Sequence, residues 1–374
     1  MAEPRSLDIG VYGIRGIPST YSGYETFASV LLPELVRRGH RVTAYCRGRR
    51  QHDSFEGVRC VYLPSVRTKQ LDTLSHGAVA TIAGRLHRHD VLLVMNVSNA
   101  LFTWLPRYTG QPVALNVDGQ EWLRGKWGKT ARRLFYRSAR ISKRTANLLI
   151  TDCDAMQDHY RQEFDAESVV IPYCWTNLVG PEDEADASAV LDELGLEPYQ
   201  YFVSGGRLIP ENNIHLIAEA YHQSSRREPL AIVGKANYES IVAQRVLELE
   251  KIDSRIRVLG HVADRRAFGL LLRFARGYIH GHSVGGMNPQ LVEAMGSGAL
   301  VFALGTAFNR EVLGEAGFYF DDPADLPALL GTALRGDGLQ QSVRAAAETR
   351  ALREYSLKRA ADGYESELRR LVAG

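Results

Sequence analysis

The chain has 374 residues, of which 45% are hydrophobic and 24% are charged, and its formal net charge is +2. A chain of this length can form two domains with separate cores, and this composition excludes a disordered protein. The nearly balanced charge gives no indication of nucleic-acid binding. Cys46, Cys60, Cys153 and Cys174 form no Cys-x-x-Cys pair, so neither a zinc site nor a disulfide framework is predicted.

The N-terminal residues contain no signal-peptide core, and no apolar run reaches the length of a membrane-spanning helix. These features favour a cytoplasmic protein. Any contact with the inner face of the plasma membrane is expected to be peripheral.

Short apolar runs alternate with longer amphipathic stretches, which is the pattern of parallel sheets covered by helices on both faces. In the first half, strands are expected near residues 8–12, 41–46, 58–63, 90–95, 112–117, 147–150 and 168–171. Helices are expected near residues 24–38, 69–87, 130–144 and 153–164. These elements define an expected first domain over residues 1–175.

The second half repeats the alternation after an acidic segment with one short helical run, residues 176–198, which we interpret as a linker. Strands are expected near residues 201–204, 230–233, 256–259, 277–280, 299–303 and 317–320. Helices are expected near residues 214–223, 238–249, 265–274 and 289–295. The second domain is therefore expected over residues 199–354, and the final helical stretch, residues 355–374, is expected to pack back on the first domain. Two such sheets imply a ligand cleft between the domains.

The stretch of residues 276–304 predicts a turn that binds an anion. A flexible Gly285–Gly286 turn follows an apolar strand, and Asn288 and Pro289 supply a helix N-cap and the first helical residue. We expect the backbone N–H groups of residues 290–292 to be unpaired at this helix start, where the helix dipole favours negative charge. Glu293 lies just over one turn inside the helix. The alternative is an ordinary strand-turn-helix connection.

Two further loops carry positive charge after expected strands. Arg207 follows Gly205–Gly206 at the carboxyl end of a strand, where a guanidinium can bind phosphate with two hydrogen bonds, although a surface arginine is the alternative. Lys235 follows the next strand and can add charge at the same edge. In the first half, Gly13, Arg15 and Gly16 leave the first strand, but their spacing is not Gly-x-Gly-x-x-Gly, which disfavours a dinucleotide oxidoreductase.

Acidic residues follow two strands of the first half. Asp118 follows the strand near residues 112–117, where its carboxylate can position a hydroxyl or act as a base, or can cap the next turn. Asp152 and Asp154 have the Asp-x-Asp spacing of metal-dependent sugar transferases. We interpret one of them as the N-cap of the next helix instead, so no metal site is predicted.

Residues 122–144 combine nine lysines and arginines with aromatic side chains. A basic amphipathic helix with this composition suits an anionic membrane surface. A solvated helix face is an equally good interpretation.

Together these blocks resemble glycosyltransferase family 4, whose members adopt the two-domain GT-B fold. The resemblance rests on the Gly-Arg-Leu loop at residues 206–208, the Gly-His-Val at 260–262 and the segment from 285 to 295. Residues 12–18, 21–25, 210–213 and 280–286 are similar to bacterial rhamnosyltransferases of capsule and exopolysaccharide assembly. That similarity implies dTDP-L-rhamnose as the donor and a growing, lipid-linked glycan as the acceptor.

The resemblance also implies roles for particular residues. Arg207 matches the arginine that binds the donor diphosphate, and Glu293 matches the glutamate that contacts the ribose. The chain departs from the family at Gly285, where a first glutamate usually stands, at Asn212, where a lysine is usual, and at Asp118, where many members have a histidine. The residues expected at the donor are Gly13, Arg15, Gly16, Arg207, Asn212, Lys235, His261, Val262, His282, Gly285, Gly286, Met287, Asn288, Pro289, Gln290, Leu291 and Glu293.

The expected reaction is a retaining, metal-independent sugar transfer in which Arg207 and Glu293 act on the donor and Asp118 orients the acceptor. One alternative is a nucleotide-sugar 2-epimerase of the same fold, which needs cleft carboxylates and histidines for proton abstraction. Only Asp118, His280 and His282 are candidates for that role. The other alternative is a scaffold that kept the fold and lost the chemistry, as Gly285 and Asn212 suggest.

Overall fold

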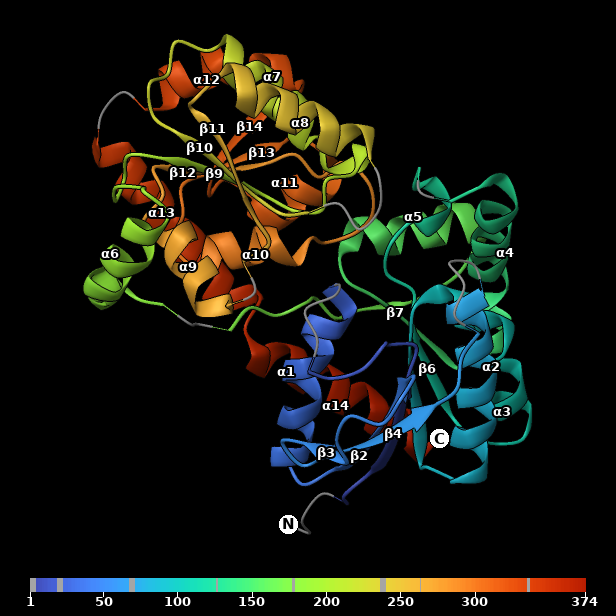
Figure 1. The fold of residues 1–374 in the computed structure, drawn as a ribbon. Helices are drawn as coiled ribbons and strands as arrows, with labels where there is room; N and C mark the ends of the chain where they lie inside the picture. The colour runs from blue at the N-terminus through green and yellow to red at the C-terminus, as the bar shows by residue number, and fades with distance from the viewer. Residues whose placement is uncertain are drawn as a thin grey trace. The chain divides into compact units, whose positions relative to one another are not determined.

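The computed structural model describes residues 5–18, 23–66, 71–125, 127–176, 179–235, 240–262, 264–334 and 337–374. The chain forms two compact units, one made of Met1–Tyr173 with Leu357–Gly374 and the other of Cys174–Ser356 (Figure 1). Each unit is an α/β layer structure with its own sheet.

The first unit is built on a sheet with the strand order β3-β4-β2-β1-β5-β6-β7-β8. All neighbouring strands are parallel except β3 and β4. The strands are β1 (Asp8–Tyr12), β2 (Arg41–Arg47), β3 (Ser54–Phe55), β4 (Val58–Leu63), β5 (Val91–Met95), β6 (Val113–Asn116), β7 (Leu148–Thr151) and β8 (Val169–Val170). The helices are α1 (Gly23–Arg37), α2 (Leu71–Leu86), α3 (Trp104–Tyr108), α4 (Lys129–Thr145), α5 (Asp154–Phe164) and α14 (Leu357–Ala373), with short 3-10 turns η1 (Val97–Leu101) and η2 (Glu121–Leu123).

The second unit has a fully parallel sheet with the order β11-β10-β9-β12-β13-β14. The strands are β9 (Phe202–Gly205), β10 (Leu230–Val233), β11 (Ile256–Gly260), β12 (Gly277–His280), β13 (Val301–Leu304) and β14 (Phe318–Phe320). The helices are α6 (Glu184–Glu193), α7 (Ile214–Gln223), α8 (Ile241–Ile252), α9 (Arg265–Arg273), α10 (Pro289–Gly296), α11 (Ala307–Leu313), α12 (Leu326–Ala333) and α13 (Asp337–Glu354), with 3-10 turns η3 (Pro181–Asp183), η4 (Pro210–Asn212) and η5 (Pro323–Asp325). Strands β10 and β13 are continuous apolar runs, as expected of strands in a sheet that helices cover on both faces.

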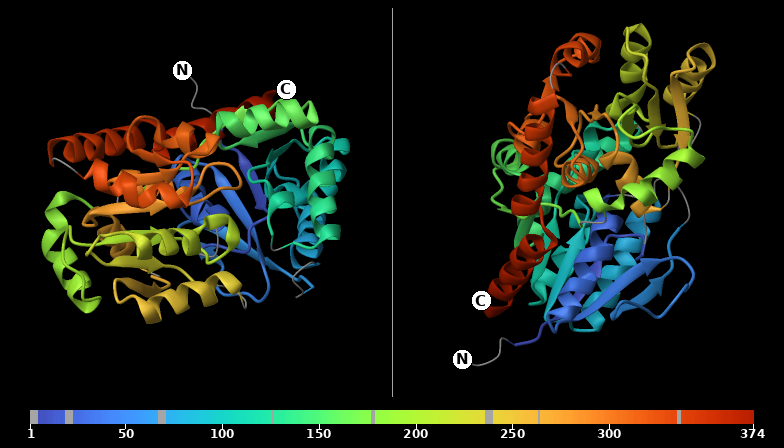
Figure 2. Two further views of the ribbon diagram at one scale, coloured as in Figure 1. Left: turned by 90° about the horizontal axis from the view of Figure 1, so that it is seen from above. Right: turned by 90° about the vertical axis from the view of Figure 1, so that its left-hand side faces the viewer.

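The last helix, α14, returns to the first unit and lies beside α1 in both views (Figures 1 and 2). Arg38, just after α1, forms ion pairs with Asp362 at 2.7 Å and Glu365 at 3.0 Å. Asn116, at the end of β6, donates a hydrogen bond from Nδ2 to the Tyr364 hydroxyl at 3.0 Å. The expectation of a returning C-terminal helix is confirmed.

The fold agrees with the alternation in the sequence, with differences at short elements. β3, α3 and α11 were not predicted, because two to seven residues are too short for a periodic pattern. The expected starts of the helices near residues 69 and 238 lie outside the described residues. The segment interpreted as a linker belongs to the second unit, where Arg266 of α9 pairs with Asp183 at 2.7 Å and Asp186 at 2.6 Å.

Candidate functional site

In the second unit, the loops after β9 and β10 pack against each other at the carboxyl edge of the sheet. Gly206 and Gly234 have φ angles of 143° and 156°. A Cβ atom added at Gly234 would lie 1.8 Å from the carbonyl oxygen of Gly206, so only glycine allows this approach. The half-buried Arg207 follows directly and is therefore held at the strand end by tightly packed backbone.

Asn212 ties this loop to the loop after β12. Its Nδ2 donates to the carbonyl oxygen of Arg207 at 2.9 Å, and its Oδ1 is 2.8 Å from Nδ1 of His282. Asn213 reinforces the connection by donating from Nδ2 to the carbonyl oxygen of Gly281 at 2.9 Å. The residue that replaces the family's lysine thus supplies no charge, but it fixes the position of the Arg207 backbone relative to His282.

Helix α10 begins as the sequence predicted, with Asn288 as N-cap and Pro289 as the first helical residue. The prediction that the following amides are unpaired is wrong. The N–H of Gln290 donates to Oδ1 of Asn288 at 2.9 Å, and those of Leu291 and Val292 reach the carbonyl oxygen of Asn288 at 3.0 and 3.5 Å. The cap satisfies these groups because its side chain and its carbonyl both face the first turn. What remains at this terminus for an anion is the helix dipole.

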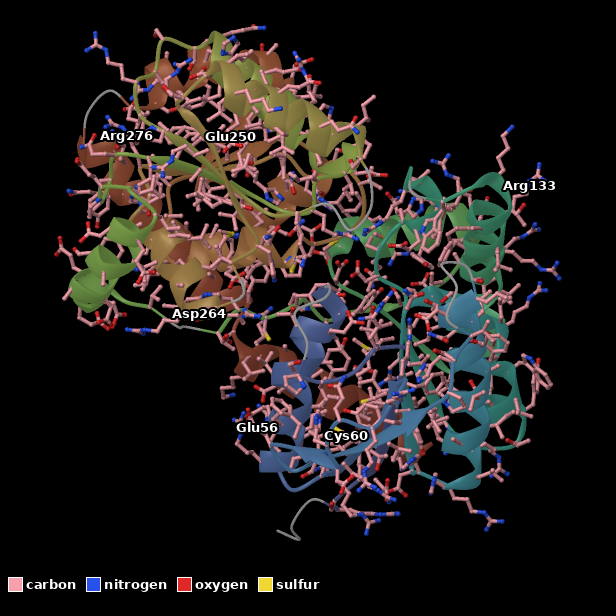
Figure 3. The ribbon with its side chains drawn as sticks, viewed as in Figure 1. Glu56, Cys60, Arg133, Glu250, Asp264 and Arg276 are labelled. Carbon is pink, nitrogen blue, oxygen red and sulfur yellow. The ribbon has the colours of Figure 1, made fainter. Side chains whose placement is uncertain are left out.

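Glu293 forms an ion pair that the sequence did not indicate. Its Oε1 is 3.2 Å from Nη2 of Arg265, at the start of α9, and its side chain is 15% exposed. Burial raises the pKa of Glu293, and the positive charge of Arg265 opposes that rise. Arg265 is the first residue of α9 and follows the N-cap Asp264, which is labelled in Figure 3. No local pattern marked Arg265, because its partner is 28 residues away.

The other expected donor residues of the second unit occupy the ends of neighbouring strands. Lys235 is exposed after β10, and His261 and Val262 follow β11. Gly285 and Gly286 are buried, with φ of 108° at Gly285, and Met287 is 5% exposed. The unit therefore gathers Arg207, His282 and the α10 terminus at one sheet edge, with Lys235 at the adjoining strand, where ligands of open parallel sheets bind.

The remaining expected donor residues, Gly13, Arg15 and Gly16, belong to the first unit. Gly13 has φ of 95°, and a Cβ there would lie 1.8 Å from the carbonyl oxygen of Met95. The packing of β1 against the end of β5 explains this glycine without a ligand.

Asp118 lies in a buried polar cluster of the first unit. Its carboxylate accepts a hydrogen bond from the Tyr173 hydroxyl, and Tyr24 donates to its backbone carbonyl at 2.6 Å. Burial raises the pKa of Asp118, and the bonds from Asp152 and Tyr173 lower it. The side chain is thus buried and already bonded, with 9% of the residue exposed.

The helix cap next to this cluster differs from the expectation. The N-cap of α5 is Cys153, so Asp152 precedes it and Asp154 is the first helical residue. The sequence analysis did not place Asp152 near Asp118, because this proximity follows only from the pairing of β6 with β7.

The basic run around α4 divides into two groups. Arg124 pairs with Glu121, Arg132 donates to the carbonyl oxygen of Arg124, and Lys143 pairs with Asp165. Four exposed arginines form no ion pair with any described residue and follow one face of the helix at spacings of four, three and four. They are Arg133, Arg137, Arg140 and Arg144, which we call the α4 stripe. Figure 3 shows Arg133 extended away from the ribbon.

Two family models match the chain in succession. Residues 22–174 match a glycosyl transferase 4-like domain, and residues 199–335 match the glycosyl transferases group 1. Together these segments span most of the chain, and with the two α/β units they assign it to the GT-B glycosyltransferases.

Individual relatives agree with this assignment. O-antigen chain mannosyltransferase B of Escherichia coli is 27% identical over 205 residues, which is 53% of the chain; the match spans about half the length of that relative. The structure of HepE from Anabaena in complex with UDP has a TM-score of 0.75 at 16% identity, with 97% of this chain and 99% of that chain covered. Sucrose-phosphate synthase from Thermosynechococcus elongatus has a TM-score of 0.80 at 16% identity, with 99% of this chain and 100% of that chain covered. These structural likenesses show the GT-B fold.

Among the described residues, no helix has both the length and the apolar character needed to cross a bilayer.

Proposed function

We propose that the protein transfers a sugar from a nucleotide diphosphate sugar to a hydroxyl of a growing glycan. The observation that carries this proposal is the carboxyl edge of the second sheet, where Asn212 connects the Arg207 backbone to His282, in the loop that leads to the start of α10. A guanidinium and a helix N-terminus at one sheet edge suit a diphosphate leaving group. Lys235 adds charge at the neighbouring strand, and the carboxylate of Glu293 accepts hydrogen bonds from the ribose hydroxyls.

The donor in this proposal is dTDP-L-rhamnose. Support comes from residues 12–18 and 280–286, which resemble the rhamnosyltransferases of surface glycans. A second candidate is a mannose donor, because the E. coli relative is a mannosyltransferase of the O-antigen chain. Gly285, in place of the family's first glutamate, leaves the sugar pocket without a carboxylate at that point, so we expect this position to influence which sugar binds.

The proposed chemistry retains the configuration of the sugar and uses no metal. Arg207 and the α10 dipole stabilise the negative charge that develops on the departing diphosphate, an effect worth about 3–4 kcal/mol for one well-placed donor group. The acceptor hydroxyl attacks from the face that the diphosphate leaves, and its proton passes to the departing phosphate. Asp118 is buried, so it orients the acceptor through the partly exposed Tyr24, which bonds to its backbone carbonyl, rather than by direct contact.

The acceptor in this proposal is lipid-linked, and the α4 stripe holds the protein at the anionic inner face of the plasma membrane. Four arginines on one helix face without carboxylate partners suit anionic lipid headgroups. The 2-epimerase alternative is disfavoured because two of its three candidate groups, Asp118 and His280, are 9% and 2% exposed.

Thermal unfolding with dTDP, UDP and GDP tests the donor. A ligand at one hundred times its dissociation constant stabilises the folded state by about 2.7 kcal/mol, so the preferred nucleotide should raise the transition of the second unit most. Rhamnose transfer predicts the largest shift with dTDP. A shift with GDP alone would favour the mannose candidate, and no shift with any of the three would contradict the transferase.

Nucleotide release tests the chemistry. With the matching nucleotide sugar, wild-type protein should release nucleotide diphosphate faster when membrane extract supplies the acceptor, whereas an epimerase needs no acceptor and a scaffold releases none. Arg207→Ala should reduce release by about 100-fold or more while the unfolding transition stays in place, because it removes charge stabilisation of the leaving group. Arg227→Ala, at an exposed arginine of the same unit, is the control. Near-normal turnover of Arg207→Ala would rule out its role at the diphosphate.

A further inference from the structure

The first unit contains a cavity of about 220 Å³ at the carboxyl ends of β1, β2 and β4. It is lined by residues 15–18 of the loop after β1, Arg47 at the end of β2, Gln51 beyond β2, Tyr62 of β4 and Asp72 of α2. Pockets for drug-sized ligands usually hold about 300–1,000 Å³, so this cavity fits one sugar ring or one small anion rather than a nucleoside diphosphate.

Positive charge predominates among the lining side chains. Among the described residues that line the cavity, Asp72 is the single carboxylate, and both Arg15 and Arg47 share it: its Oδ2 lies 3.2 Å from Nη1 of Arg47 and 3.9 Å from Nη2 of Arg15. Although burial acts to raise it, the pKa of Asp72 is lowered by the hydrogen bond from Ser65 and by the two guanidinium charges. Glu25, outside the lining, accepts from the backbone N–H of Arg15 at 2.9 Å.

Arg47 is held in place but not fully bonded. Its side chain is 10% exposed, and Nη1 donates to Asp72 and to the Thr73 hydroxyl. Its Nε is buried and has no hydrogen-bond partner among the described residues. The hydrogen bonds that its guanidinium donates to those residues come from Nη1. Burial lowers the pKa of Arg47. A desolvated guanidinium with unused N–H groups at a cavity wall is a strong binding site for an oxyanion.

The other walls suit a sugar ring. Ile17 and Pro18 are apolar, Gln51 offers an amide, and Tyr62 offers a ring and a hydroxyl. The carbonyl of Ile17 is fixed by Nε2 of His52 at 2.8 Å, so the loop wall is held in position.

We propose that this cavity binds an oxyanion, a carboxylate or a phosphate, carried by a sugar of the acceptor glycan. The proposal rests on the transferase function above, with the donor in the second unit. Arg15 and Arg47 bind the anionic group, Asp72 and Gln51 bind hydroxyls, and Tyr62 contacts the sugar ring. The protein therefore selects an anionic acceptor over a neutral one.

Saturation-transfer NMR on the full chain tests the proposal with three probes: D-glucuronate, glucose 1-phosphate and D-glucose. One or both anionic sugars should bind at least about tenfold more tightly than glucose. Tighter binding of glucuronate identifies a carboxylate as the group, and tighter binding of glucose 1-phosphate identifies a phosphate. Equal binding of all three, or binding of none, would overturn the proposal.

Arg47→Gln should weaken binding of the anionic sugar at least about tenfold, because it removes a charge-assisted pair. The control is Arg49→Gln, which removes the same charge from an exposed residue just after β2 that does not line the cavity. If Arg47→Gln does not fold, Arg47→Lys keeps the charge and loses the planar fork, and should still weaken binding several-fold. Unchanged binding in a folded variant would overturn the assignment to this cavity.

Nucleotide stabilisation, measured on the same samples, separates this proposal from the proposed function. If Arg47→Gln loses nucleotide stabilisation, the cavity belongs to the donor site and the acceptor role is overturned. If nucleotides stabilise the wild type and no anionic sugar binds, only the cavity proposal fails. If an anionic sugar binds and no nucleotide does, the transferase fails and with it the acceptor role of the cavity.

Discussion

His280 ends β12 as a buried histidine, 2% exposed, with the Tyr278 hydroxyl 3.2 Å from Nδ1. Burial lowers its pKa to about 3. A histidine in an unfolded chain has a pKa of about 6.5. The folded state therefore holds His280 neutral, and this contributes stability that is fully present above about pH 6.5 and is lost as the pH falls towards 3.

We predict that the second unit loses about 2 kcal/mol of stability between pH 7 and pH 5 through this residue alone. In His280→Asn, which cannot take up a proton in this range, the loss between the two pH values should be smaller by that amount, whatever the stability of the variant at pH 7. Urea unfolding at both pH values measures the difference. Equal pH dependence in the two proteins would show that His280 is not the group responsible.

At the site itself, residues were predictable where their role depends on the local chain. The cap at Asn288 and the position of Arg207 after β9 follow from short sequence patterns. The pairing of Glu293 with Arg265 and of Asp118 with Asp152 depends on which strands and helices become neighbours, and no spacing in the sequence encodes that. The occupied amides of α10 were missed because the cap residue offers two acceptors, its side chain and its carbonyl.

At the scale of elements, Arg38 links α1 to α14. It is 19% exposed and binds Glu34 at 2.9 Å, Asp362 at 2.7 Å and Glu365 at 3.0 Å. Burial acts to lower the pKa of Arg38, but the hydrogen bonds to the three carboxylates outweigh this effect and raise the pKa. Three carboxylates around one guanidinium form a network, which contributes more than isolated surface pairs do.

We predict that Arg38→Ala destabilises the first unit by about 1–3 kcal/mol, between the values for surface and buried ion pairs. The matched control is Arg37→Ala, one residue earlier, where the side chain is 59% exposed and pairs with Glu34 alone. It should cost less than about 1 kcal/mol. Denaturant unfolding measures the free energy of unfolding of both variants. Similar losses of this free energy would mean that the contact with α14 contributes little to stability.

Elements with a clear sequence pattern were predictable, and elements without one were not. The ranges of β4, β10, β12 and α7 agree with the sequence prediction, because each is a clear apolar run or an amphipathic stretch between turn residues. β3 has two residues and exists only because it pairs antiparallel with β4, so nothing within it could predict a strand.

At the scale of the whole molecule, the α4 stripe is the feature through which the protein would meet a membrane. Each lysine or arginine near an anionic surface contributes about 1 kcal/mol. Arg132 is not part of the proposed membrane contact, because its guanidinium donates hydrogen bonds to the backbone carbonyl of Arg124.

We predict that Arg137→Gln with Arg140→Gln weakens binding to phosphatidylglycerol vesicles about 10- to 30-fold. Arg353→Gln with Arg370→Gln removes the same charge from exposed arginines that pair with neighbouring glutamates, and should leave vesicle binding nearly unchanged. Vesicle sedimentation measures both, with phosphatidylcholine vesicles as the neutral surface. Equal binding of the wild type and the stripe variant would mean that α4 is an ordinary solvated helix with no role in membrane binding.

The return of α14 to the first unit has a consequence for how the chain is made. Arg38 and Asn116 leave the ribosome before the second unit, whereas their partners Asp362 and Tyr364 leave after it. The paired residues are 324 and 248 positions apart, so at typical rates of about 5–20 residues per second roughly 12 to 65 s separate these events. Throughout that interval the surface of α1 that α14 covers stays open to solvent and to chaperones. The second unit, although it is synthesised later, is therefore the first to have all of its residues available for folding.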